Sequence, residues 1–271
     1  MKIDCLKFIE EVKNNTDLTE RKKLTVIQVG NNPASTLYVN SKKKESEKWN
    51  IECNIVNMKE ESTTEEVIKQ VLLNTDSDGI IVQLPLPAHI NQQEVIDAIP
   101  AGLNVDGFKQ TNKETLFEPC TPKGIIMLLE SLTSLEGKVV TLIGRGKTVG
   151  EPLRDMLLKK NCTLAVCHSK SGRFNTYRLC RLSDIVISAV GEPNLFNHEW
   201  LKDSLNPIIV IDAGISRVNG KQVGDFSHKV KDYRLDLDLS DKIQYTPWVN
   251  GVGKLTVMAL MLNVRNSKKI I

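Results

Sequence analysis

Short apolar runs alternate with amphipathic stretches along most of this chain. The runs have the length and content of buried β-strands, and the stretches repeat apolar residues at helical spacing. We predict strands at residues 24–29, 53–57, 79–83, 138–143, 163–167, 184–189 and 208–213, and helices at residues 34–49, 64–73 and 92–98. This alternation favours right-handed βαβ units and parallel sheets.

Cap residues mark where several helices should begin. Asn32 precedes Pro33, which combines a good N-cap with a good first helical residue. Thr121 precedes Pro122 in the same way, so we expect Thr121 to cap a helix that bridges two halves of the chain. Pro152 should start the helix after the first strand of the second half.

The stretch between residues 104 and 121 is poor in apolar residues and divides the pattern in two. A chain of 271 residues is long enough for two domains. We predict an α/β protein with an N-terminal βαβ catalytic domain at residues 1–120 and a C-terminal Rossmann-like, doubly wound parallel sheet at residues 121–250. The pattern allows a C-terminal helix, about residues 250–271, to return to the first domain.

Composition and charge narrow the class of protein. A net charge of +3 is too small to indicate nucleic-acid binding. No apolar run reaches the ~20 residues of a membrane span, and the amino terminus lacks the apolar core of a signal peptide, so we expect a cytoplasmic protein. The six cysteines form no C-x-x-C pair and have no histidine at metal-ligand spacing, which favours reduced thiols and no metal site.

A glycine-rich turn follows the strand at residues 138–143. Gly144, Gly146 and Gly150 give the spacing G-x-G-x-x-x-G, one residue longer than the usual dinucleotide fingerprint. Alone the signal is weak, because any strand-to-helix turn can hold glycines. The preceding strand and following helix strengthen it, and Gly144, Arg145, Gly146 and Val149 become candidate cofactor-binding residues.

The next strand ends in Cys167-His168-Ser169-Lys170, without a carboxylate. NAD-binding folds place Asp or Glu there to bond the ribose hydroxyl. Arg145, Ser169 and Lys170 could instead receive a 2′-phosphate, which favours NADP over NAD. The alternative is that these are solvated loop residues.

Small residues end the later strands, where a flat cofactor can approach the backbone. Ala189 and Gly191 follow the third strand of this half, and Ile215 follows Gly214 after the fourth. Gly251 and Gly253 are candidates for the same kind of role. Each glycine could equally serve a turn.

In the first half, Gln83 ends a buried apolar strand, and Pro85 and Pro87 forbid its continuation. Ligands of open α/β sheets bind at such carboxyl ends, although an ordinary strand exit has the same form. Tyr38 and Lys42 share one helix face at i, i+4. A lysine in a partly dry cleft has a depressed pKa and could transfer protons; the alternative is an exposed lysine whose stem packs on Tyr38.

Asp106 lies in a turn sequence, where it could bind the N–H groups of a ligand or cap the turn. Taken together, the motifs resemble the bifunctional methylenetetrahydrofolate dehydrogenase/cyclohydrolase family. The matching segments are residues 29–35, 38–42, 78–87, 105–108, 119–124, 144–145, 149–150, 167–170, 183–193 and 246–247.

The resemblance implies oxidation of 5,10-methylenetetrahydrofolate with NADP and hydrolysis of the methenyl product to 10-formyltetrahydrofolate, in a cleft between two domains. By analogy, Tyr38 stacks on the pterin–aminobenzoate portion, Asp106 holds the pterin N–H edge, and Lys42 is the acid/base that Gln83 orients. Further substrate-binding residues implied are Leu84, Pro85, Gly251 and Gly253, and further cofactor-binding residues are His168, Ala189, Gly191 and Ile215. A homodimer and a role in supplying purine biosynthesis are also expected of the family.

The chain departs from the family pattern in three places that bear on ligands, and one of them is the segment after Asp106, which is shorter than usual and suggests a more open pterin pocket. Gly146 stands where a serine is usual, and the loop at residues 248–254 lacks two prolines and one glycine of the family sequence. Three other functions remain open: a member with only one activity, a non-catalytic folate- or nucleotide-binding protein, and an amino-acid or hydroxy-acid dehydrogenase. The last would require a catalytic His or Lys beside the nicotinamide, whereas His168 falls at the phosphate end.

Overall fold

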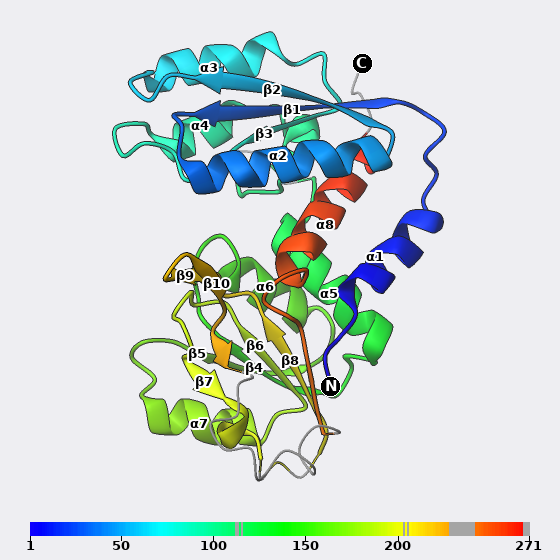
Figure 1. Cartoon of the computed structure of the whole chain (residues 1–271), viewed down its shortest axis with the longest axis vertical. Helices are drawn as coiled ribbons and strands as arrows, with labels where there is room; N and C mark the ends of the chain where they lie inside the picture. Colours follow the sequence, from blue (N-terminus) through cyan, green and yellow to red (C-terminus); the bar gives the residue numbers. More distant parts are fainter. Residues whose placement is uncertain (112–113, 115, 203, 205, 228–241, 268–271) are drawn as a thin grey trace. The chain divides into compact units, whose positions relative to one another are not determined.

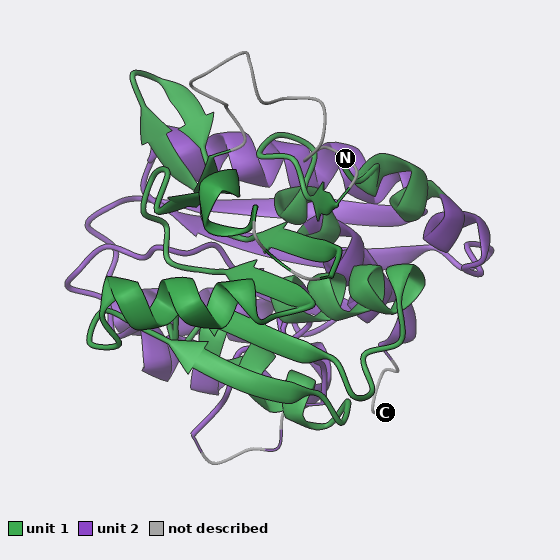
Figure 2. Ribbon diagram, turned by 90° about the horizontal axis from the view of Figure 1, so that it is seen from below, with its two compact units in different colours: residues 1–10, 121–256 green, residues 11–120, 257–271 purple. Residues whose placement is uncertain are grey.

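The computed structural model describes residues 1–111, 114, 116–202, 204, 206–227 and 242–267. The chain divides into two compact units (Figure 2): unit 1 contains residues 1–10 and 121–256, and unit 2 contains residues 11–120 and 257–271. The chain therefore enters each unit twice. Residues 268–271, at the end of the expected C-terminal helix, lie outside the described residues.

Unit 2 is built on a three-stranded parallel sheet of order β2–β1–β3 (Figure 1). Its elements are β1 (Lys22–Val29), α2 (Pro33–Lys48), β2 (Ile51–Met58), α3 (Thr64–Leu73), β3 (Gly79–Val82), α4 (Gln92–Ala98) and the 3-10 turn η1 (Ala101–Leu103). The central strand β1 is almost entirely buried, because strands flank it on both sides. Ile27 and Val82 of the sheet pack with Val67 of α3 and Val95 of α4 in one apolar core.

Unit 1 holds a five-stranded parallel sheet of order β12–β8–β6–β4–β5. The strands are β4 (Val139–Ile143), β5 (Thr163–Cys167), β6 (Ile185–Ser188), β8 (Ile208–Asp212) and β12 (Ile243–Tyr245), and the helices between them are α6 (Gly150–Leu158) and α7 (Arg173–Arg181). The chain passes from β4 to β5 on one side and then to β6 on the other. That reversal is the point where doubly wound sheets bind ligands.

Smaller elements complete unit 1, and helices α1, α5 and α8 each cross a boundary between the units. These elements are α1 (Cys5–Asn14), α5 (Cys120–Leu132), β7 (Phe196–Asn197), η2 (His198–Trp200), β9 (Ser216–Val218), β10 (Lys221–Val223), β11 (Phe226–Ser227) and α8 (Val252–Asn266). Residues 1–10, which the sequence pattern grouped with the N-terminal domain, cluster with unit 1. Ile3 N–H donates to Tyr245 O at 2.8 Å there, which ties the amino terminus to β12.

The α/β class and the parallel sheets are confirmed, and all seven predicted strands are present with small shifts of their ends. Asn32 caps α2 as expected, with Oδ1 accepting from Ala34 N and Ser35 N. The predicted starts at Pro122 and Pro152 were wrong, because α5 and α6 each begin two residues earlier. Proline is tolerated within the first helical turn, so it did not fix the first residue. Thr121 is therefore inside α5, and its Oγ1 lies 2.9 Å from Thr256 Oγ1.

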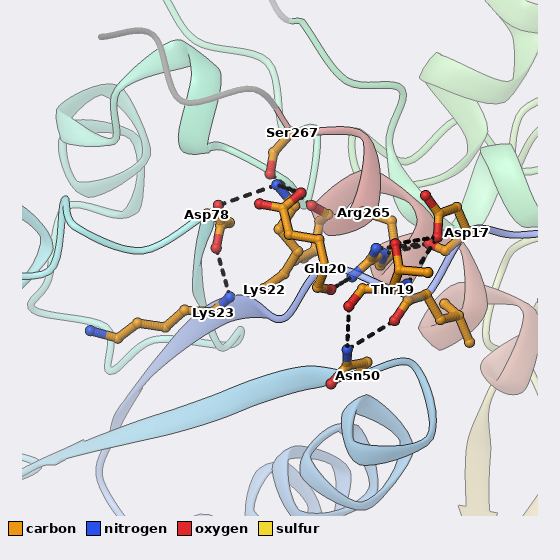
Figure 3. Close-up of polar contacts among 11 residues, drawn as sticks. Asp17, Thr19, Glu20, Lys22, Lys23, Asn50, Asp78, Arg265 and Ser267 are labelled. Carbon is orange, nitrogen blue, oxygen red and sulfur yellow. Dashed lines mark hydrogen bonds and ion pairs between the residues drawn. The ribbon is translucent and has the colours of Figure 1, made fainter.

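The end of α8 is hydrogen-bonded to the segment that precedes β1 (Figure 3). The Arg265 guanidinium donates to Asp17 O at 2.7 and 3.1 Å and also to Glu20 O. Next to it, Lys23 N–H donates to the buried Asp78 carboxylate at 2.7 Å. Lys22 Nζ links the two sets of contacts, because it lies 2.9 Å from Glu20 Oε2 and 3.7 Å from Asp78 Oδ1, so the segment before β1 and the end of α8 share one polar network within unit 2. Across the described ranges, none of the helices combines the length and apolarity that crossing a membrane requires.

Candidate functional site

Unit 2 brings Lys42 and Gln83 together. Lys42 lies on α2, and Gln83 follows β3, where its N–H donates to Ile27 O at 2.8 Å and so extends the sheet ladder. Lys42 Nζ donates to Gln83 Oε1 at 3.0 Å, and Gln83 Nε2 donates to Leu84 O at 2.6 Å. The two residues are 4% and 8% exposed. The alternative of an exposed lysine on Tyr38 is thereby excluded.

The surroundings of Lys42 disfavour its charged form. Burial lowers the pKa of Lys42, and the negative charge of Asp106 only partly offsets this effect. Burial raises the pKa of Asp106, and the charge of Lys42 acts in the opposite direction. Lys42 Nζ also lies 4.7 Å from the centroid of the Tyr38 ring. Tyr38, Lys42, Gln83 and Asp106 therefore form one cluster, which we call the Lys42 cluster.

The loop that carries Asp106 is held by a residue far away in the sequence. Asn263 of α8 is fully buried, and its Nδ2 donates to Val105 O at 2.9 Å and to Glu118 O at 3.0 Å. Cys120 Sγ also donates to Val105 O, at 3.3 Å. Sequence reasoning missed Asn263, since no local pattern links it to a carbonyl 158 positions earlier.

The predicted folate-side residues occupy different places. Leu84 and Pro85 follow Gln83 directly in the turn after β3; Leu84 is half-buried, Pro85 is exposed, and the peptide bond between them is cis. Gly251 and Gly253 belong to unit 1, just before and within the first turn of α8. A Cβ at Gly251 would lie 1.9 Å from Pro247 O, so this turn requires glycine.

Unit 1 contains a cavity of about 570 Å³ at the carboxyl ends of its strands, within the usual size range of small-molecule sites. Gly144 connects β4 to the turn before α6 with φ 111°, and a Cβ there would lie 2.5 Å from Ala189 O. Glycine is therefore required on both conformational and spatial grounds. The cavity is lined by Ile143, Gly144, Arg145, Gly146, His168, Ser169, Gly172, Arg173, Thr176, Ala189, Val190, Glu192, Asn194, Leu195 and Trp200.

The cavity gathers six of the ten predicted cofactor-binding residues: Gly144, Arg145, Gly146, His168, Ser169 and Ala189. Val149, Lys170, Gly191 and Ile215 are not among the lining residues. Lys170 instead donates its N–H to His168 Nδ1 at 3.2 Å, and Gly191 O accepts from Ser216 Oγ at 2.5 Å.

Among the lining residues that sequence reasoning missed are Arg173 and Trp200. The Arg173 guanidinium carbon lies 5.4 Å from the centroid of the Trp200 ring, which places a cation over an aromatic face. Arg173 is the first residue of α7 and follows the His168-Ser169 turn. Its place just after β5 was the sequence signal that could have identified it as a cavity residue. Together Arg145, Ser169 and Arg173 give the cavity hydroxyl and guanidinium donors where β5 ends without a carboxylate. That donor set fits a phosphate-bearing dinucleotide.

The loop that departs from the family sequence is anchored through its tryptophan. Trp248 Nε1 donates to Phe226 O at 2.9 Å, and Trp248 O accepts from Gln222 Nε2 at 2.6 Å. A side chain absent from the family pattern thus ties this loop to β11, and the backbone of the same residue ties it to β10 of the same unit.

Known protein families match both parts of the chain. The family described as "Tetrahydrofolate dehydrogenase/cyclohydrolase, catalytic domain" matches residues 4–106, and that described as "Tetrahydrofolate dehydrogenase/cyclohydrolase, NAD(P)-binding domain" matches residues 119–270. "Bifunctional protein FolD" of Aquifex aeolicus is 39% identical over 272 residues, covering 96% of this chain and 89% of the relative.

Solved structures agree with the sequence matches. The bifunctional enzyme FolD, methylenetetrahydrofolate dehydrogenase/cyclohydrolase, from Campylobacter jejuni has a TM-score of 0.83 at 34% identity and covers 98% of both chains. The Trypanosoma brucei N5,N10-methylenetetrahydrofolate dehydrogenase-cyclohydrolase, complexed with NADP cofactor and inhibitor, has a TM-score of 0.82 at 27% identity, covering 97% of this chain and 95% of that one. The chain therefore belongs to the tetrahydrofolate dehydrogenase/cyclohydrolase family.

Proposed function

We propose that this protein oxidises 5,10-methylenetetrahydrofolate to the 5,10-methenyl form with NADP and hydrolyses the methenyl form to 10-formyltetrahydrofolate. Unit 2 binds the folate at the Lys42 cluster, and unit 1 binds NADP in its cavity. The observation that carries the proposal is the buried Lys42–Gln83 hydrogen bond, because a protein that only binds folate has no need of a buried amine with a lowered pKa.

The hydrolysis uses Lys42 as the proton acceptor. A neutral Lys42 amine takes a proton from water as the water oxygen bonds to the cationic methenyl carbon. The tetrahedral adduct then breaks its C–N5 bond: N5 keeps the electron pair and takes the proton of the adduct hydroxyl, whose oxygen becomes the formyl carbonyl, so that one proton is released overall. Gln83 holds the amine through its Oε1, and the cationic substrate further favours the neutral lysine.

The remaining residues of the Lys42 cluster position the folate. Tyr38 offers a half-buried ring for stacking against the pterin–aminobenzoate portion, with Leu84 and Pro85 next to Gln83 as further contacts. Asp106 accepts from the pterin N–H edge, and Asn263 holds the backbone before it. These roles agree with the polarity and burial of each group.

The oxidation is served by the unit 1 cavity, where NADP, when bound, supplies the two-electron acceptor. Gly144 N–H donates to Cys167 O at 2.8 Å, so the backbone N–H groups of Arg145 and Gly146, which follow it in the turn before α6, are the ones offered to the pyrophosphate. Arg145 and Ser169, with Arg173, offer donors to the 2′-phosphate, and Ala189 forms part of the cavity wall. The residues of this cavity thereby orient the cofactor.

A coupled assay tests the proposal. Purified protein is mixed with methylenetetrahydrofolate and either NADP or NAD, and the methenyl absorbance is followed as it rises and decays. We expect both steps, with a clear NADP preference. A rise without decay would leave a dehydrogenase only, and binding without turnover of either substrate would contradict the proposal.

We also propose a cytoplasmic homodimer that supplies formyl groups for purine biosynthesis. Exposed apolar side chains at Ile215 and at Val218 of β9 support an association surface on unit 1. Light scattering after size-exclusion chromatography measures the mass, and a monomer at micromolar concentration would contradict the dimer.

A further inference from the structure

A buried carboxylate organises one wall of the unit 1 cavity. Asp225 is fully buried and accepts three hydrogen bonds, from Ser188 Oγ at 2.6 Å, Val190 N at 2.9 Å and Glu192 N at 2.8 Å. The donors alternate along residues 188–192. Val190 and Glu192, with Ala189 between the donors, line the cavity.

Asp225 is itself rigidly placed. Its backbone N–H donates to Asp212 Oδ1 at 3.1 Å, at the end of β8. On its other side, a Cβ added at Gly214 would lie 2.0 Å from Asp225 Oδ1, so the carboxylate fills all the space there. The Asp225 carboxylate is therefore held in one position by its packing and hydrogen bonds.

Asp225 accepts from both alternate N–H groups of the wall. Residues 189–192 belong to no helix or strand. Ala189 N–H donates to Ile143 O at 2.8 Å, and the carbonyls of Gly191 and Glu192 accept from Ser216 Oγ at 2.5 Å and Leu195 N at 3.2 Å, whereas the N–H groups of Val190 and Glu192 both donate to Asp225. Hydrogen bonds to a buried, charged acceptor are stronger than neutral ones, so this carboxylate can order the segment before any ligand arrives.

We propose that Asp225 is a positioning residue that holds the wall at residues 189–192 in the geometry that binds NADP. The inference rests on the proposed NADP-dependent function. In this arrangement the conformational entropy of residues 189–192 is lost when the protein folds, so NADP binding does not have to order them. Removing the Asp225 carboxylate should therefore weaken NADP binding more than it slows turnover at saturating NADP.

Three substitutions separate positioning from general stability. Asp225→Asn keeps the shape, but its amide group presents an NH₂ to one of the two backbone donors; we expect NADP binding to weaken about 10- to 100-fold. Ser188→Ala removes a single donor and should weaken binding about threefold. Asp184→Asn is the matched control, because Asp184 accepts from Val139 N at 2.9 Å at the opposite ends of the strands.

The test measures NADP binding by calorimetry, amide hydrogen exchange of residues 189–192, and KM and kcat of the dehydrogenase step. We expect faster exchange of the wall amides and a higher KM for NADP in Asp225→Asn, with kcat within about threefold of the unsubstituted protein. Unchanged exchange and unchanged binding would overturn the proposal, as would an equal loss in Asp184→Asn. If Asp225→Asn does not fold, Ser188→Ala decides by the same readouts. If the unsubstituted protein does not bind NADP, the proposed function fails, whereas the exchange comparison still decides whether Asp225 orders the wall.

Discussion

The amine of Lys42 and the side-chain carbonyl of Gln83 lie 3.0 Å apart, although the two residues are 41 positions apart in the sequence. A neutral acceptor leaves the charge of Lys42 uncompensated at this contact. The pair therefore holds the amine in place without fixing it in the protonated form.

Lys42→Met should abolish the cyclohydrolase step. Loss of a positioned acid/base typically costs about 10²- to 10⁴-fold in rate. The dehydrogenase step should fall much less, because it depends on positioning the reactants. The measurement is the decay of added methenyltetrahydrofolate, and Lys44→Met, at an exposed lysine of the same helix, is the control. Near-normal decay in Lys42→Met would remove Lys42 from the mechanism.

The lowered pKa of Lys42 also predicts how stability depends on pH. The unfolded lysine titrates near 10.5, and the folded one titrates lower, so between the two pKa values the unfolded state binds more protons. The free energy of unfolding should therefore rise with pH in that window, by up to about 1.4 kcal/mol per pH unit relative to Lys42→Met. Urea unfolding of both proteins across a pH series measures the difference. If the free energy of unfolding changed with pH equally in both proteins, burial of the Lys42 amine would not have lowered its pKa.

Gly146→Ser should tighten NADP binding about 2- to 10-fold, the worth of one added hydrogen bond. Gly146 lines the cavity, and a Cβ there would meet nothing within 4 Å, so the serine that is usual in the family can be accommodated. The opposite result is expected at Gly144, where alanine would collide with Ala189 O. Calorimetric titration with NADP compares the two variants. A weaker affinity in Gly146→Ser would mean that the turn has been rebuilt around glycine.

Asn263→Leu should disturb the Asp106 loop without touching any predicted ligand contact. It leaves Val105 O and Glu118 O without the Nδ2 donor, at a cost of about 1–3 kcal/mol for buried polar groups that lose a partner. We expect a lower free energy of unfolding together with a higher KM for the folate substrate. Asn266→Leu, at an exposed position of the same helix, is the control. A loss of stability with an unchanged KM would make Asn263 purely structural.

Local patterns predicted the parts of the protein that local chemistry decides. The strands after residue 22, the Asn32 cap and the helices at α3 and α4 follow from apolar spacing and capping. The pairing of Lys42 with Gln83 was expected only from the resemblance to the family, because Lys42 lies in the middle of α2 and Gln83 follows β3. Their burial could not be predicted, because it depends on the packing of α2 against the sheet.

Long-range contacts account for what was missed. Asn263 and Asp225 carry no local signal; each becomes informative only when folding brings distant carbonyls or amides to it. Lys170 was chosen for its charge and its position beside Ser169, but Arg173, three residues later, lines the cavity instead. The turn after His168, with Gly172 at φ 78°, redirects the chain in a way that charge spacing does not reveal.

The return of α8 to unit 2 has a consequence for protein synthesis. After residues 1–10, a ribosome makes residues 11–120, then all of residues 121–256, and only then Asn263 and Arg265. Until those two residues emerge, the carbonyls at positions 17, 20, 105 and 118 lack the donors that α8 brings. Unit 1 can therefore form its sheet during synthesis before α8 has been made, while the Lys42 cluster, made earlier, still lacks the contacts of α8. Unit 2, most of which is translated before the sheet of unit 1, therefore receives its last residues after that sheet has been made.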